Sequence, residues 1–240
     1  MNILALDTSF AACSAAIGRG LGAHACEVFG LFEPMQTGQA ERIVPMVGEV
    51  LATAGMKIDD IDRIAVANGP GSFTGTRIAV AAARALVLAS ARVNVVAVSS
   101  LAVMAERAAD FLVDAGGREL IVVVDARRDE VYAQRFQRRH GAAGAVALDE
   151  PQVLSFDDAA RLGGMGAVDF CGSGAAEVAR RATALGRDAA AHLPDLLPDA
   201  RDLARLAMRL EPASGPVRPL YLRPADAKPQ TGKSIERVHP

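Results

Sequence analysis

The sequence of 240 residues contains no tryptophan, two tyrosines, three cysteines and three lysines. Cys13, Cys26 and Cys171 are far apart and form no C-x-x-C pair, so they indicate neither a disulfide framework nor a zinc knuckle. No hydrophobic run has the length needed to cross a bilayer, because Arg84 interrupts the longest one at residues 78–91. The first residues also lack the basic start of a secretory signal. We therefore expect a soluble, cytoplasmic chain.

The charge of the chain is close to balanced. The 26 basic and 28 acidic side chains give a net charge of −2, which excludes a strongly cationic nucleic-acid binder but not a local basic patch. A hydrophobic fraction of 51% excludes intrinsic disorder. This length predicts one large domain or two small ones, each able to bury a core.

Strand-like and helix-like segments alternate along the chain, which predicts an α/β protein. The first three strands have no helix between them and should form an antiparallel meander. Ser100 is expected to cap a third helix that ends near residue 116. The elements expected before it are strands at 2–6, 13–17 and 21–31, a helix at 38–54, a strand at 60–67, a helix at 76–90 and a strand at 93–98.

A pattern of strand, aspartate, short turn and second strand occurs twice. Asp7 ends the first such strand, and Asp125 ends the second. We interpret this repeat as two α/β halves, spanning residues 1–108 and 109–211, followed by an extended, proline-rich tail at 212–240. The second half should continue with a short helix capped by Ser155, a strand at 167–171, a tight turn at 172–174, a helix at 175–185 and a last helix from Pro198 to about residue 210.

The two aspartate turns are candidate phosphate-binding turns. A carboxylate at a strand end can position a metal or a water, and turn amides can hold phosphate, although a single aspartate turn is also an ordinary structural feature. Two such turns facing each other across a cleft are similar to the layout of the actin, hexokinase and Hsp70 (ASKHA) superfamily. The second turn, however, lacks the glycines that close phosphate approach requires. We therefore expect vestigial turns without nucleotide hydrolysis, at Asp7, Thr8, Ser9 and Asp125.

The most distinctive string is a glycine-rich loop at residues 68–77. It is neither a P-loop nor a dinucleotide fingerprint. It could hold an anion at the start of the following helix, or it could be only a tight strand-to-helix turn, and its composition favours the two equally. Its candidate residues are Gly69, Pro70, Gly71, Ser72, Phe73, Thr74, Gly75 and Arg77.

The first two helices are apolar on most of their circumference. Small residues recur at helical spacing in both, which allows two helix axes to approach closely. One side of each helix should face its own sheet, and the other could face either the core or a partner. Periodicity alone favours the core. Pro45 lies inside the first helix and should kink it.

No catalytic set can be assembled from the spacing of the polar residues. The four histidines are isolated, and no His-x-x-x-His pair or Ser-His-Asp set is present, so we expect no metal and no cofactor. The arginines at 127, 128, 135, 138 and 139 cluster, but nearby acidic residues offset them. This pattern is typical of a solvated hairpin face, with a nucleic-acid phosphate contact as the alternative.

Five segments together resemble the bacterial TsaB (YeaZ) family. They are residues 1–9, the loop at 68–77, Val-Ser-Ser-Leu at 98–101, residues 124–132, and Pro-Leu-Tyr-Leu-Arg at 219–223. The resemblance implies a two-lobed fold of the actin/Hsp70 type. It also implies a role in making threonylcarbamoyladenosine next to the tRNA anticodon, as a non-catalytic scaffold for the transferase TsaD. TsaD moves the threonylcarbamoyl group from threonylcarbamoyl-AMP to adenosine N6, and the ATPase TsaE supports turnover.

The resemblance also implies which surface binds the partner. The resemblance implies that the first two helices dock against TsaD, or against a second copy when the protein is alone. It also implies that the chain contacts tRNA indirectly, through the complex. Where relatives often have His-Ser-Glu, this chain has Gln39-Ala40-Glu41, which weakens any case for a metal. The implied partner-binding residues are Glu41, Val44, Pro45, Gly48, Ala52, Gly75, Ile78, Ala79, Ala82, Ala83 and Leu86.

Two other functions remain open at this stage. An M22-type metallohydrolase or glycoprotease would need a metal-binding set that the sequence does not reveal. A nucleotide-binding module of the ASKHA superfamily would need measurable ATP affinity in the chain alone.

Overall fold

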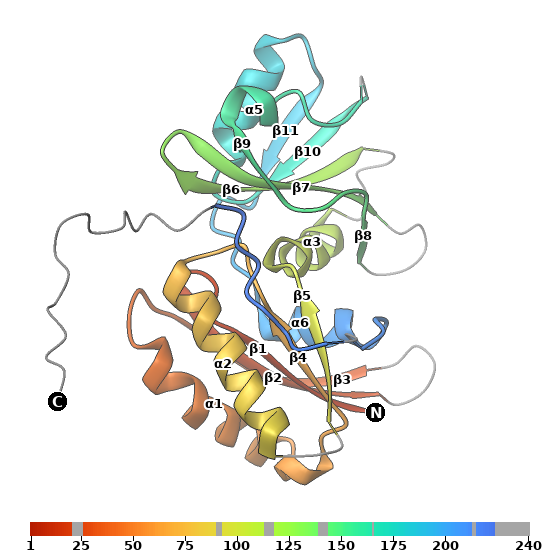
Figure 1. Ribbon diagram of the computed structural model, residues 1–240. Helices are drawn as coiled ribbons and strands as arrows, with labels where there is room; N and C mark the ends of the chain where they lie inside the picture. The colour runs from red at the N-terminus through yellow and green to blue at the C-terminus, as the bar shows by residue number, and fades with distance from the viewer. Residues whose placement is uncertain are drawn as a thin grey trace, which may run out of the picture.

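The computed structural model describes residues 1–20, 26–89, 93–112, 118–138, 144–164, 166–212 and 215–223. It consists of two lobes, each built on one sheet (Figure 1). Among the described residues, no helix is long and apolar enough to cross a membrane.

The first lobe contains a five-stranded sheet of order β3-β2-β1-β4-β5. Strand β1 pairs antiparallel with β2 and parallel with β4, so an opening hairpin leads into a parallel edge. The helices α1 (Gln39–Thr53) and α2 (Phe73–Ala89) cover one face of this sheet. Its strands are β1 (Asn2–Asp7), β2 (Ala12–Gly20), β3 (Cys26–Pro34), β4 (Arg63–Ala67) and β5 (Asn94–Val98), with a 3-10 turn at Ile58–Asp60 before β4.

The second lobe repeats this plan with the strand order β8-β7-β6-β10-β11, and β9 pairs with β7. Strand β6 is antiparallel to β7 and parallel to β10, as β1 is to β2 and β4. The expected duplicated, two-lobed fold of the actin/Hsp70 type is thereby confirmed. The elements are β6 (Glu119–Arg127), β7 (Glu130–Arg138), β8 (Ala145–Ala147), β9 (Gln152–Ser155), α4 (Phe156–Ala159), β10 (Val168–Cys171), α5 (Ala175–Ala184) and β11 (Ala189–His192).

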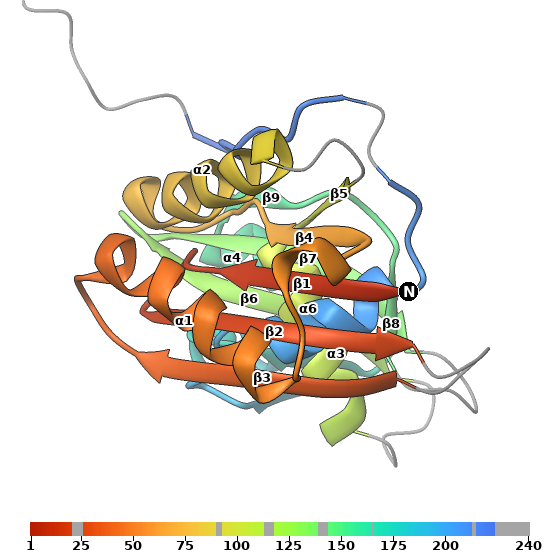
Figure 2. The ribbon, with the colours of Figure 1, turned by 90° about the horizontal axis from the view of Figure 1, so that it is seen from below.

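Two helices, α3 (Ser100–Phe111) and α6 (Ala200–Ala207), lie between the sheets (Figures 1 and 2). Strand β1 is buried on both faces: Leu4 faces the core under α1 and α2, whereas Ile3 faces the core around α6. Helix α3 packs on the second sheet, against Leu120 and Val122. The layers therefore run helices, sheet, helices, sheet, helices, and α6 covers the first sheet although it follows the second lobe in the chain.

Several element boundaries differ from those expected. Helix α2 begins at Phe73 rather than residue 76, because the Ser72 hydroxyl accepts a hydrogen bond from the Gly75 amide. Ser99, not Ser100, caps α3. Asp199 caps α6, which begins at Ala200 rather than Pro198. The short strands β8, β9 and β11 were not expected, and residues 21–25 of the expected third strand lie outside the described residues.

The end of the described chain is extended and docked, as expected. The Leu220 amide donates to the Asn68 carbonyl oxygen at 2.7 Å, and Arg84 Nε donates to the Val217 carbonyl oxygen at 2.8 Å. Further along, Arg223 Nη1 donates to the carbonyl oxygen of Ala126 in the second lobe at 2.6 Å. Residues 217–223 thus connect α2 to the β6–β7 turn.

Candidate functional site

The first aspartate turn is closed inside the protein. Asp7, Thr8 and Ser9 are fully buried. Asp7 Oδ1 accepts hydrogen bonds from the Ser9 hydroxyl at 2.5 Å and the Ser9 amide at 3.2 Å, while Oδ2 has no hydrogen-bond partner among the described residues. Burial raises the pKa of Asp7 to about 7, against the lowering effect of the Ser9 hydrogen bonds. This turn does not present its carboxylate to solvent or to a ligand.

The glycine-rich loop is what closes the turn. A Cβ atom at Gly71 would lie 2.3 Å from the Ser9 carbonyl oxygen, and one at Gly75 would lie 2.0 Å from that of Thr8. The Ser72 amide also donates to the Ser9 carbonyl oxygen at 2.7 Å. These glycines allow two backbone segments to touch, which supports the tight-turn interpretation of the loop rather than anion binding.

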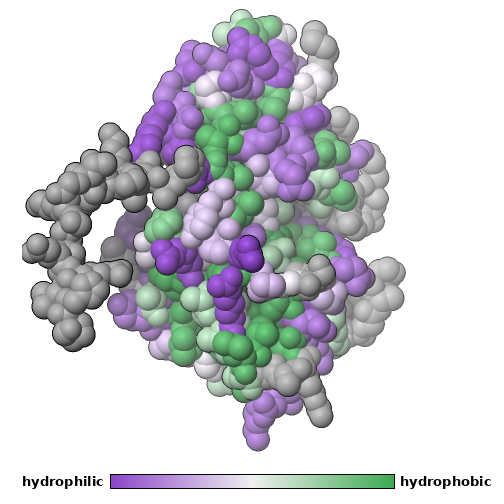
Figure 3. Space-filling view, in the orientation of Figure 1, coloured by the Kyte–Doolittle hydropathy of each residue, from purple (hydrophilic) through white to green (hydrophobic). Residues whose placement is uncertain are grey.

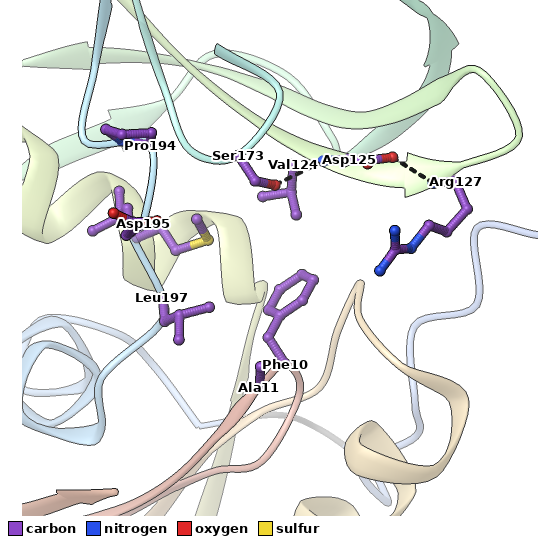
Figure 4. A pocket seen from close by; sticks show the side chains of 11 residues that line it. Phe10, Ala11, Val124, Asp125, Arg127, Ser173, Pro194, Asp195 and Leu197 are labelled. Carbon is purple, nitrogen blue, oxygen red and sulfur yellow. Dashed lines mark hydrogen bonds between the residues drawn. The ribbon is translucent and has the colours of Figure 1, made fainter. Parts of the chain in front are cut away.

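The second aspartate turn opens into a cavity of about 350 Å³ between the lobes (Figure 4). The Asp125 amide donates to the Ser173 hydroxyl at 3.0 Å, so residues 172–174 contact the second aspartate turn, a contact that the sequence did not predict. Asp125 Oδ1 accepts from the Arg127 amide at 2.7 Å. The cavity is lined by Phe10, Ala11, Met104, Val124, Asp125, Arg127, Ser173, Pro194, Asp195, Leu196 and Leu197.

The lining of this cavity is poorly suited to a polyphosphate. Phe10, which follows the buried first turn, projects into the cavity from the first lobe (Figure 4). Among the described residues that line it, Arg127 is the one cation, and the carboxylates of Asp125 and Asp195 would repel phosphate. The cavity can enclose a small, partly apolar group, but it lacks the paired open turns of a nucleotide clamp.

The β6–β7 turn is conformationally unusual. Arg127, Arg128 and Asp129 have φ values of 65°, 59° and 59°, a left-handed run without glycine. Such residues carry strain that surrounding contacts must offset. The Arg223 guanidinium donates to the carbonyl oxygens of Ala126 and Arg127 and pairs with Glu130. The tail therefore holds this turn in place.

The arginine cluster on the second hairpin is not uniformly solvated. Arg138 is mostly buried and lies 3.3 Å from Asp169 Oδ2, which also pairs with Arg118 through its other oxygen. Arg135 pairs with Glu119 at 2.5 Å. The expected solvated face is therefore wrong for these arginines, because the inner strands β6 and β10 supply acidic partners, the partly buried Glu119 and the buried Asp169. Residue 139 lies outside the described residues.

The structure exposes only some of the residues of the first two helices that were expected to bind a partner. In α1, the residues on the sheet side are buried, and the expected partner residues are exposed: Glu41, Val44, Pro45, Gly48 and Ala52. In α2, by contrast, Gly75, Ala79 and Ala83 are buried within the chain, so they cannot form a partner surface. They pack close to the sheet and the first turn because they are small. Ile78, Ala82 and Leu86 are only partly buried.

We call the exposed and partly exposed residues of this pair the α1–α2 face, made of Glu41, Val44, Pro45, Gly48, Ala52, Ile78, Ala82 and Leu86. Val44 has 67% of its surface exposed. Hydrophobic residues gather over the lower lobe, where these helices lie (Figure 3). A Cβ atom at Gly48 would meet nothing within 4 Å, so the surface there is open to close approach.

The described residues include no group of three His, Cys, Asp or Glu side chains that could hold a metal ion. His192 Nε2 lies 3.2 Å from Asp169 Oδ1, and histidines 24, 140 and 239 lie outside the described residues. Burial raises the pKa of Cys13 and of Cys171 to about 12, so both remain protonated thiols rather than nucleophiles.

One exposed cluster was not expected from the sequence. The rings of Phe73 and Tyr221 stack with centroids 5.6 Å apart, and Arg77 Cζ lies 4.9 Å from the Phe73 centroid. The two rings are far apart in sequence and meet only because the tail returns to α2. The only local signal was an aromatic residue inside a glycine-rich loop.

Known proteins with similar sequences and structures share this architecture. A family model described as TsaD, tRNA N6-adenosine threonylcarbamoyltransferase, matches residues 33–210. The chain is 35% identical over 161 residues to the tRNA threonylcarbamoyladenosine biosynthesis protein TsaB of Escherichia coli strain K12. A crystal structure described as an uncharacterised protein with similarity to peptidase YeaZ, from Pseudomonas aeruginosa, is 33% identical with a TM-score of 0.74, covering 92% of this chain and 99% of that one.

The chain belongs to the TsaD-type family and, within it, to the TsaB (YeaZ) proteins. The match covers 64% of this chain and 64% of the E. coli TsaB, which is less than two thirds of either. An uncharacterised protein of Mycobacterium bovis is 33% identical over 237 residues, covering 95% of this chain and 94% of that protein.

Proposed function

We propose that this TsaB-family chain is a non-catalytic scaffold for TsaD. With TsaD and the ATPase TsaE, it would support transfer of the threonylcarbamoyl group from threonylcarbamoyl-AMP to N6 of the adenosine next to the tRNA anticodon. The observation that carries this proposal is the α1–α2 face, an exposed surface of small and apolar side chains. The names of the TsaB relatives and the TsaD family model support it.

The shape of the α1–α2 face suits another pair of helices. A Cβ atom at Gly48 would meet nothing within 4 Å, and Val44, one turn before it, is exposed, so side chains of a partner helix can approach α1 closely here. TsaD, a two-lobed sister protein, would present the corresponding pair. In the absence of TsaD, a second copy of this chain could occupy the same face as a homodimer.

Co-purification with TsaD tests this proposal. Val44→Arg and Gly48→Arg each place a charge on the face without touching the core, so both should abolish co-purification while the circular dichroism spectrum is unchanged. Leu185→Arg is the matched control, because Leu185 is an exposed leucine in the other lobe, and this variant should bind TsaD normally. Ala79→Arg is unsuitable because Ala79 is fully buried. Normal binding by folded Val44→Arg and Gly48→Arg proteins would reject the face.

The metallohydrolase alternative is less well supported. It requires three convergent ligands, and the part of the chain that the structure describes supplies no such group. Stoichiometric zinc or iron in the purified chain, together with hydrolytic turnover, would favour it over the scaffold. The nucleotide-module alternative is weakened by the closed Asp7 turn, and it predicts ATP binding to the chain alone by calorimetry.

A further inference from the structure

The ring–arginine surface lies where the tail passes the start of α2. We define it by Phe73, Arg77, Arg84, Arg218 and Tyr221. Phe73 and Tyr221 are 56% and 51% exposed, and their rings are inclined by only 27°, so they form a short stack open to solvent. This stack is separate from the α1–α2 face, which uses other residues of α2.

The stack is held in place by backbone contacts rather than by its own packing. The Asn68 side-chain amide donates to the Arg218 carbonyl oxygen at 3.1 Å, and the Leu220 amide donates to the Asn68 carbonyl oxygen at 2.7 Å. These bonds fix the tail on both sides of Pro219, and Tyr221 follows directly. The rings are therefore pre-organised, which lowers the entropy lost when a ligand stacks on them.

The two chain segments that carry the stack contain charged residues of one sign only. Residues 63–105 and 212–225 contain no aspartate or glutamate. Arg84 Nε donates to the Val217 carbonyl oxygen, which places this arginine beside the tail. Within the described ranges, no ion pair involves Arg77, Arg84 or Arg218, in contrast to the paired arginines of the second sheet.

Stacked rings beside arginines that form no ion pair within the described ranges suit a flexible polyanion that carries flat apolar faces. Each exposed nucleobase can stack on an aromatic ring whatever its identity, and guanidinium groups bind phosphate. Aromatic residues and arginine are also enriched in protein–protein interfaces, and binding measurements with TsaD and TsaE separate the two cases. We propose that the ring–arginine surface binds unpaired RNA, with a base stacked on Tyr221 and phosphates held by Arg77 and Arg218. This inference rests on the proposed function for the identity of the RNA as the substrate tRNA.

Direct binding of RNA by the full-length chain tests this proposal. The probes are a fluorescein-labelled anticodon stem–loop RNA and a fully paired RNA of the same length, measured by anisotropy at stated salt. Tyr221→Leu and Phe73→Leu should each weaken binding of the stem–loop by about 5- to 100-fold, because each removes a stacking ring. Arg77→Gln should lower the salt-dependence slope by about 0.7. The paired RNA should bind weakly and respond little to the ring substitutions.

Two controls are matched in chemistry. Phe111→Leu removes an exposed ring from α3, and Arg180→Gln removes an exposed arginine from α5. Both should leave binding within twofold of wild type. The chain has no tryptophan and only two tyrosines, so in a Tyr132→Phe variant all tyrosine emission comes from Tyr221. Stem–loop RNA should quench that emission, and paired RNA should not.

Three results would overturn the proposal. The first is no stem–loop binding by the wild-type chain, alone or mixed with TsaD, and the second is equal affinity in the ring variants and the controls. The third is loss of TsaD or TsaE binding by the ring variants with unchanged RNA affinity, which would make this surface a protein contact. Failure of the scaffold proposal looks different. In that case TsaD would not bind the chain, while RNA binding would still depend on the rings.

Discussion

The Thr8 hydroxyl donates a hydrogen bond of 2.6 Å to the carbonyl oxygen of Gly75, joining the first aspartate turn to the start of α2. The Cβ position of Gly75 would in turn lie 2.0 Å from the Thr8 carbonyl oxygen. The first aspartate turn, which the sequence made a candidate for phosphate binding, is here a packing surface for a helix. Helix α2 is thereby positioned with the side opposite the turn toward solvent, next to the exposed side of α1.

Two glycines in helices should respond in opposite ways to the same substitution. Gly75→Ala forces a methyl group into buried backbone and should lower the free energy of unfolding by about 2 kcal/mol or more. Gly48→Ala adds a methyl group in open space within α1 and should raise it by about 0.5–1 kcal/mol. Urea denaturation followed by circular dichroism measures both. Equal effects would contradict the packing described for Gly75.

The buried Asp7 carboxyl should make stability depend on pH. Its pKa rises from the ordinary value of 3.8 to about 7 in the folded protein. Between these values the folded protein holds a proton that the unfolded chain has lost, so the free energy of unfolding should decrease as pH rises from about 4 to 7. The slope from this group is at most about 1.4 kcal/mol per pH unit, and it should vanish above pH 7.

The Asp7→Asn variant isolates this effect, since asparagine does not titrate. Its stability should lack the Asp7 contribution to the slope between pH 4 and 7, whatever its absolute value. Denaturation curves of both proteins across this range measure the difference. Parallel pH profiles for the two proteins would show that Asp7 is ionised in the folded state.

Arg223 should couple the tail to the second lobe. Arg223→Ala removes two hydrogen bonds to carbonyl oxygens and the pair with Glu130, so we expect a loss of about 1–2 kcal/mol in unfolding free energy. Amide hydrogen exchange should become faster at the left-handed turn, residues 127–129. Arg161→Ala serves as the control, because Arg161 donates to one exposed carbonyl oxygen and should change stability by less than about 0.5 kcal/mol. An unchanged exchange rate at the turn would contradict the claim that Arg223 holds this turn in place.

Local pattern was enough to predict some features of the fold. Both hairpins follow from a short hydrophobic run that ends at an aspartate turn and is followed by a second strand-like segment, and these contacts are short-range. Strand β11 was missed because Ala189–His192 has no β-branched or aromatic residue to indicate a strand. The start of α6 was predicted at Pro198 because Pro198 and Asp199 are both acceptable at a helix start. In the structure Asp199 is the cap, since its side chain accepts a hydrogen bond from the Arg201 amide.

The candidate site could be predicted less well than the fold. Helical spacing identified a small-residue stripe at Gly75, Ala79 and Ala83, but spacing does not reveal whether a sheet or a partner covers it. The stripe in α1 is exposed and the one in α2 is buried, because only α2 runs directly over the first turn. The stack of Phe73 and Tyr221 depends on the path of the tail, which no local pattern specifies.

The most direct test of the scaffold proposal is formation of threonylcarbamoyladenosine in tRNA by TsaD from the same cell, with threonylcarbamoyl-AMP supplied. We predict strong product formation when the wild-type chain and TsaE are added, none with the chain alone, and little with Val44→Arg, while Leu185→Arg supports the reaction normally. Equal product with and without the chain, or modification by the chain in the absence of TsaD, would contradict it.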